Sequence, residues 1–318
     1  MSRTKRAASG SVFLFALVAL LPGVAAARPG VLSPAVRVLK ISYRAHDGRQ
    51  RRAYLILPAW YRPERDPAIP LVISPHGRGV GARINVKRWG NLPAIGGFAV
   101  INPEGQGRTL TLFSWGDPGE IDDLARMPQI AKDAMPWLRI DRHRIYAFGG
   151  SMGGQETLLL AAKFPHLLAG AASFDAPTDM AARYRAFDHL RFGDRLQQLA
   201  RREIGGTPSA DPRAYEIRSP LDWTRRIAFS HVPLQIWWSR RDTIVGDQEH
   251  ESGLLYRDIK RLNPEAAVSE YVGNWAHTTE MKRHGYLPFA LAQFGLVPPT
   301  RQTPPTGKPT KPRGGIPV

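Results

Sequence analysis

Ser151 stands between Gly149 and Gly153 in a Gly-x-Ser-x-Gly pattern. The apolar run at 144–148 before it is typical of a buried strand, and the residues after it favour a helix. In a nucleophile elbow the serine occupies a strained strand-to-helix turn, and a Cβ two residues to either side would clash there. The turn also aims backbone N–H groups, that of Met152 first, at the position where negative charge develops during attack on a carbonyl. We therefore predict that Ser151 is a nucleophile.

A serine hydroxyl is a weak nucleophile near neutral pH, so it requires a histidine base and an acid, in the chain order Ser, Asp or Glu, His. Asp242 follows one apolar run and His277 follows the next. Asp175, at the end of the strand expected after the elbow helix, is an alternative acid. An ordinary loop histidine beside Trp275 is the alternative interpretation of His277. The order and spacing predict a catalytic triad of Ser151, Asp242 and His277.

A His-Gly-Arg-Gly turn at 76–79 follows the first apolar run expected to form a parallel strand. Because glycine lets backbone N–H groups approach a substrate oxygen closely, the amide of Gly77 or Arg78 is the predicted second oxyanion donor beside Met152. His76, Trp115 and Trp275 are the candidates for the wall of the substrate pocket. His76 is also suited to ordering its own loop, and Trp115 to a packed core position.

These residues need a scaffold that brings strand ends together. An opening antiparallel hairpin is expected over 35–41 and 52–57. Buried strands are expected at 69–74, 97–102, 144–148, 167–174, 232–238 and 268–272, and helices at 121–138, 154–164 and 247–262. The alternation predicts the α/β class, with a mostly parallel, doubly wound sheet and the reacting groups at the carboxyl ends of its strands.

One long interval interrupts this alternation. Residues from about 176 to 231 are helix-prone and rich in arginine and aromatic side chains, with breaks at glycine and proline. Because the interval lies between two strands, we expect a helical cap insertion above the elbow that shapes the substrate pocket. The catalytic domain as a whole is expected to span residues 36–297.

The two ends differ from this domain in composition. A basic start, an apolar stretch of about eleven residues and small residues ending near Ala27 predict a signal peptide over 1–27, hence a secreted, periplasmic or cell-surface protein. After its removal no segment is long and apolar enough to span a membrane. Residues 298–318 form a basic, proline-rich tail, expected to be disordered, which is either a plain extension or a tether to an anionic cell surface.

The charge and the motifs exclude several other classes. The formal net charge is +17, but the arginines are scattered, which favours anionic surfaces over sequence-specific nucleic-acid recognition. There is no cysteine, so neither disulfides nor thiolate metal sites form. No clustered His, Asp or Glu spacing calls for a metal, and no glycine-rich nucleotide-binding pattern is present, so we expect no cofactor and no nucleic-acid partner.

The His-Gly-Arg-Gly loop, the elbow, Asp242 and His277, in that order, resemble secreted α/β-hydrolase serine esterases and peptidases related to prolyl oligopeptidase catalytic domains and to depolymerase-type and feruloyl esterases. The resemblance covers roughly residues 36–297 and implies an α/β-hydrolase fold and acyl transfer to water. Two features depart from the family: these 318 residues leave no room for a β-propeller, and they contain no cysteine for the usual disulfides.

Without a propeller, nothing evident would bind an extended peptide and offset the higher barrier of an amide. Aromatic residues of the cap could enclose an apolar or aromatic acyl group; they are Tyr184, Phe187, Phe192 and Trp223. We therefore predict hydrolysis of a small-molecule or polymeric carboxylic ester. A prolyl-oligopeptidase-like serine peptidase is the first alternative, and a non-catalytic secreted binding protein on a hydrolase fold is the second.

Overall fold

The computed structural model describes residues 35–303 and residue 305. The predicted signal peptide at 1–27 lies outside the described residues, as does most of the predicted tail at 298–318. Among the residues that are described, no helix has the length and apolar character needed to cross a membrane.

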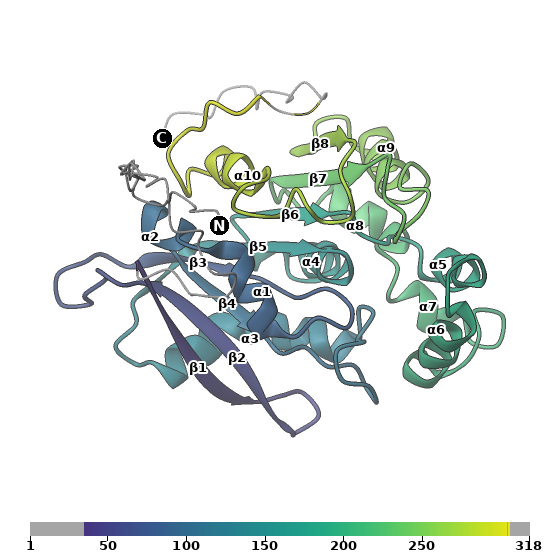
Figure 1. Cartoon of the computed structure of the whole chain (residues 1–318), viewed down its shortest axis with the longest axis horizontal. Helices are drawn as coiled ribbons and strands as arrows, with labels where there is room; N and C mark the ends of the chain where they lie inside the picture. The colour runs from purple at the N-terminus through teal and green to yellow at the C-terminus, as the bar shows by residue number, and fades with distance from the viewer. Residues whose placement is uncertain (1–34, 304, 306–318) are drawn as a thin grey trace, which may run out of the picture. The chain divides into compact units, whose positions relative to one another are not determined.

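An eight-stranded sheet with the order β1-β2-β4-β3-β5-β6-β7-β8 forms the centre of the fold (Figure 1). The strands are β1 Val36–Arg44, β2 Gln50–Pro58, β3 Ile69–Ile73, β4 Ala99–Pro103, β5 Ile140–Gly150, β6 Gly170–Phe174, β7 Leu234–Ser239 and β8 Val268–Gly273. The expected hairpin of β1 and β2 is antiparallel and joins β4 antiparallel, whereas all pairs from β4 to β8 are parallel. The predicted α/β class and mostly parallel sheet are confirmed.

Helices cover both faces of this sheet, so the central strands are apolar on both sides. In β3, Leu71 and Ile73 belong to one buried cluster and Val72 belongs to the other, as the alternation of a strand requires. The first cluster includes side chains of α3 Pro118–Ala134, α4 Met152–Lys163 and α9 Ser252–Leu262; the second includes those of α1 Ala82–Trp89, α2 Leu92–Gly96 and α10 Leu287–Gln293. The helices predicted from the sequence did not include α1, α2 and α10, each of which has eight residues or fewer.

The interval expected to form a cap contains α5 Met180–Ala186, α6 Gly193–Ala200, a π-helical turn Arg201–Gly205, α7 Pro212–Glu216 and α8 Thr224–Ala228. Helices α5, α6 and α7 lie together at one side of the sheet (Figure 1). Their apolar side chains form a third cluster with Trp115 and Met152, next to the elbow. Helix α8 instead contributes Ile227 and Ala228 to the main core, so it belongs to the helical layer on the sheet.

Glu203, in the π-helical turn, attaches these helices to the loop that follows β4. Its buried carboxylate accepts hydrogen bonds from the backbone N–H groups of Arg108, Thr109 and Leu110, the last two at 2.8 Å. A carboxylate that accepts several N–H donors holds two chain segments together more firmly than apolar contact alone. The helices beside the elbow are therefore attached to the loop after β4, at a point far in sequence from their own chain connections.

Candidate active site

Strand register brings the predicted residues to one edge of the sheet. Gly150 at the end of β5 pairs with Phe174 at the end of β6, and Phe174 pairs with Trp237 of β7. The residue that follows β5 is Ser151, and the residue that follows β6 is Asp175. The loops that carry Asp242 and His277 leave the same edge after β7 and β8. The parallel sheet thus gathers at its carboxyl edge the groups that the sequence separates by more than a hundred residues.

Ser151 occupies a sharp turn between β5 and α4, with φ 60° and ψ −128°. This conformation is strained for a residue other than glycine, and it is the conformation expected of a nucleophile elbow. A Cβ on Gly149 would collide with the carbonyl oxygen of Gly153, and one on Gly153 would collide with that of Pro75. The two glycines are therefore required by close approach of the backbone, which is the physical reason given for them from the sequence.

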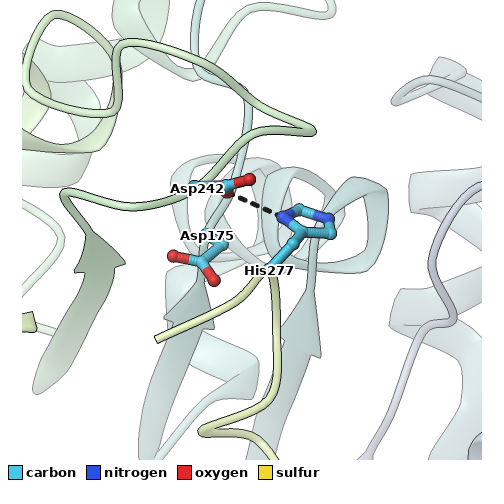
Figure 2. A group of neighbouring side chains, drawn as sticks. All are labelled: Asp175, Asp242 and His277. Atoms are coloured by element: carbon cyan, nitrogen blue, oxygen red, sulfur yellow. Dashed lines mark hydrogen bonds and ion pairs between the residues drawn. The ribbon is translucent and has the colours of Figure 1, made fainter. Parts of the chain in front are cut away.

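Asp242 and His277 form a hydrogen bond, with 2.7 Å between Asp242 Oδ2 and His277 Nδ1 (Figure 2). The other carboxylate oxygen, Oδ1, accepts the backbone N–H groups of Ile244 at 2.8 Å and Val245 at 3.0 Å. These two donors hold the carboxylate in the orientation in which Oδ2 faces His277 Nδ1. The ring must then donate from Nδ1, which leaves Nε2 as a base.

Asp175, the alternative acid, has different partners. Its Oδ2 accepts the backbone N–H of Thr278 at 2.7 Å, and its Oδ1 accepts that of Ser239 at 3.0 Å. The indole N–H of Trp275 also points at this carboxylate, 3.2 Å from Oδ2. Burial, and then the nearby negative charge of Asp242, raises the pKa of Asp175 to about 6 against the opposing effect of the Thr278 N–H. Asp175 therefore holds the backbone around His277 and does not bond to the imidazole.

Asp175, Asp242 and His277 each offer one potential ligand atom, and these atoms lie within 4.8 Å of one another. Such a cluster is a possible geometry for a metal site. Here, however, both oxygens of Asp175 face N–H donors, and Asp242 is bonded to the ring nitrogen. The arrangement matches an oriented histidine with an anchored loop better than a set of converging ligands.

Ser151 lies beside the loop that carries His277. A Cβ on Gly150 would be 3.1 Å from the side-chain methyl of Thr278, the residue after the histidine. The hydrogen bonds within the described part of the chain do not include one between Ser151 Oγ and His277, so only the Asp242–His277 half of the predicted triad is bonded. Catalytic hydrogen bonds are often long in the absence of substrate and tighten when it binds.

The predicted oxyanion donors flank the serine. A Cβ on Gly77 would lie 3.6 Å from the Cβ of Ser151, and Met152 is the first residue of α4. Among the described residues, no carbonyl accepts the backbone N–H of Arg78 or Met152. Unpaired N–H groups on two sides of a nucleophile are the arrangement that stabilises a tetrahedral oxyanion.

The pocket candidates occupy three different environments. Trp115 is buried and lines a cavity of about 20 Å³ beside Ser151. His76 is buried behind the loop, 2.9 Å from the carbonyl oxygen of Gly77 through Nδ1, and burial lowers its pKa. Trp275 bonds to Asp175, as described above. His76 and Trp275 therefore order loops, and neither lines this cavity.

Other side chains line the same cavity, although no sequence pattern indicates them. They are Pro177, Arg183, Ile244 and Val245. Arg183 lies in the insertion and is one of many scattered arginines, so only the packing of α5 shows that it lines the cavity beside Ser151.

No family model matches the chain. A curated relative from Bacillus subtilis (strain 168), described as the uncharacterized peptidase YtmA, is 30% identical over 155 residues, covering 49% of this chain and 56% of that protein. The chain therefore matches about half the length of this relative.

Solved structures share the fold at low identity. Acylaminoacyl peptidase from Pyrococcus horikoshii has a TM-score of 0.60 at 17% identity, over 78% of this chain and 38% of that one. An esterase from Pyrococcus furiosus has a TM-score of 0.55 at 18% identity, and the match covers 81% of this chain and 89% of that one. An S-formylglutathione hydrolase from Agrobacterium tumefaciens has a TM-score of 0.59 at 12% identity, and the match covers 82% of this chain and 95% of that one. The predicted α/β-hydrolase fold is confirmed.

Proposed function

We propose that this chain is an exported serine hydrolase that cleaves carboxylic esters through Ser151, His277 and Asp242. One observation carries the proposal: the hydrogen bond of 2.7 Å between Asp242 and His277, formed at the sheet edge where the elbow presents Ser151. A histidine oriented by a buried carboxylate beside a strained serine is suited to proton transfer from that serine. Export rests on the composition of the N-terminal residues alone.

The reaction proceeds by acyl transfer. His277 Nε2 takes the proton of Ser151 as Oγ attacks the ester carbonyl, and Asp242 stabilises the imidazolium that forms. The N–H of Met152 and that of Gly77 or Arg78 hold the oxyanion. His277 then protonates the departing alcohol, leaving an acyl group on Ser151. Attack by water, with His277 again the base, releases the carboxylic acid and restores the serine.

Ester cleavage is preferred over amide cleavage on energetic grounds. An alkoxide or phenoxide departs more readily than an amine, so triad and oxyanion hole suffice without remote substrate binding. A peptidase is the second candidate, and it is favoured by the 30% identity to a relative described as a peptidase. The structural neighbours include both kinds of hydrolase.

The test combines active-site labelling with a matched substrate pair. A fluorophosphonate probe should label the wild type at Ser151, and Ser151→Ala should lose both the label and the activity. Undiminished labelling of this variant would remove Ser151 from the mechanism, and absence of any labelling in the wild type would favour a binding protein. A 4-nitrophenyl ester and a 4-nitroanilide with the same acyl group then separate the candidates, because kcat/KM for the anilide equal to or above that for the ester identifies a peptidase.

A further inference from the structure

Two arginines from separate elements share the cavity beside Ser151. Arg78 comes from the turn after β3, and Arg183 comes from α5 in the insertion. Both guanidinium groups lie over the ring of Phe187, at 5.7 Å and 5.0 Å from its centroid. Two like charges are thus held close together beside the nucleophile.

Neither guanidinium is neutralised by a carboxylate within the described chain. The ion pairs there include no partner within 4.0 Å for either arginine. Arg183 donates to the carbonyl oxygen of Ile244, and the buried Arg78 Nη1 has no hydrogen-bond partner among the described residues. Burial, and then the positive charge of Arg78, lowers the pKa of Arg183 to about 10. The cationic pair is therefore held in place at an energetic cost.

The acids that act on Arg183 are engaged elsewhere. Glu251 accepts the backbone N–H of Asp179 at 2.8 Å and the hydroxyl of Thr178 at 2.9 Å. Asp242 is bonded to His277. A negative charge from outside the chain would pair with the arginines without breaking either contact.

We propose that Arg78 and Arg183 bind a carboxylate of the substrate, so that the preferred ester carries an anionic group close to the bond that is cleaved. This inference rests on the proposed function. Arginine is suited to the role because its planar fork of N–H donors matches the two oxygens of a carboxylate. The cavity of about 20 Å³ holds about one water molecule, so a carboxylate would have to displace the side chains that line it as it enters. The carboxylate belongs to either the acyl part or the alcohol part of the ester, and the two sources require separate substrates.

The experiment compares anionic and neutral esters of the same length. In the acyl arm, mono-4-nitrophenyl adipate is compared with methyl 4-nitrophenyl adipate. In the alcohol arm, 4-butyryloxybenzoate is compared with its methyl ester. In one arm, kcat/KM for the anionic ester should exceed that for the neutral ester by about 10-fold or more, the scale of hydrogen bonds to charged groups. A ratio of one or less in both arms overturns the inference.

Three variants then test whether the arginines cause the preference. Arg78→Met and Arg183→Met should each reduce the anionic-to-neutral ratio by about 10-fold. Arg185→Met, two residues further along α5 and exposed, is the matched control and should keep the ratio. An equal loss for both esters of a pair in Arg78→Met and Arg183→Met would show that the side chains act on the oxyanion or on folding, and it overturns the inference.

A measurement on the unmodified protein covers the case in which a variant fails to fold. Adipate should inhibit hydrolysis of the neutral ester competitively, at a concentration about 10-fold lower than the uncharged adipamide. Equal inhibition by the two compounds overturns the inference. Cleavage of the neutral esters without anionic preference refutes this inference alone, whereas absence of both cleavage and fluorophosphonate labelling refutes the proposed function.

Discussion

Replacing Asp242 with asparagine should reverse the tautomer of His277. In the structure, Oδ1 accepts two backbone N–H groups, from Ile244 at 2.8 Å and Val245 at 3.0 Å. Asparagine has a single oxygen, which must take this position, because an NH₂ group there would face two donors. The NH₂ group is then placed against His277 Nδ1, at the position where Oδ2 now lies at 2.7 Å.

The imidazole can accept this N–H only with its proton on Nε2, and that tautomer cannot take a proton from Ser151. We expect kcat to fall by about 10³- to 10⁴-fold, the scale of the loss when the histidine of a Ser-His-Asp triad is held in the wrong tautomer. The loss corresponds to about 4 to 5.5 kcal/mol of transition-state stabilisation. Because shape and volume are retained, the fold should be preserved.

The assay is hydrolysis of 4-nitrophenyl butyrate under saturating conditions, with thermal unfolding measured in parallel. Asp247→Asn is the matched control: this exposed aspartate bonds to His250 near the surface and should have wild-type turnover. If Asp242→Asn keeps kcat within about 10-fold of the wild type while its fold is intact, the tautomer argument is wrong.

Two further substitutions test the elbow and a buried acid. Gly153→Ala should lower the free energy of unfolding by about 3 kcal/mol or more and abolish activity, because its Cβ would meet the Pro75 carbonyl. Gly246→Ala is the control, since its Cβ would meet no atom of the described residues within 4 Å. Equal melting temperatures for the two variants would contradict the steric argument. Burial, and then the charge of Glu120, raises the pKa of Glu156 well above its ordinary value. The contribution of Glu156 to folding stability should therefore be fully present below its unfolded-state pKa of about 4.5 and should be lost as pH rises toward its folded-state pKa. Glu156→Gln should flatten this decline in urea unfolding between about pH 5 and pH 8, whereas the exposed Glu216→Gln should not; an unchanged slope in Glu156→Gln would contradict this assignment.

The sheet was predictable because its strands are short, buried and bounded by turns. Runs such as 69–74 and 232–238 are apolar throughout, which follows from burial on both faces. Helix α1 buries Ala82, Asn85, Val86 and Trp89 at helical spacing. It was missed because this face includes the polar Asn85, whereas the apolar Ile84 is exposed. The helices beside the elbow end before the predicted cap boundary near residue 231, since Ile227 and Ala228 pack in the main core. The local sequence around an apolar residue does not show against which part of the fold its side chain will pack.

The site was less predictable, because its contacts join residues far apart in the chain. Ser151 follows from local rules, since the elbow requires small residues at fixed positions around it. The pairing of Arg78 with Arg183 follows only from the way in which α5 packs beside the turn after β3. No spacing in the sequence distinguishes Arg183 from Arg185, which is exposed on the same helix.

Asp175 and Asp242 show what decides the role of an acid at this edge. Both follow parallel strands and both lie between Ser151 and His277 in the chain, so the order Ser, Asp, His does not by itself separate them. The donors that face each carboxylate differ: Asp175 accepts the N–H of Thr278, next to the histidine, whereas Asp242 accepts the ring N–H itself. Loss of either carboxylate would displace the imidazole, one through its loop and the other directly. Turnover alone therefore does not identify the triad acid, and a parallel measurement of stability is needed, because loss of Asp175 also removes contacts that hold the ends of β7 and β8 together.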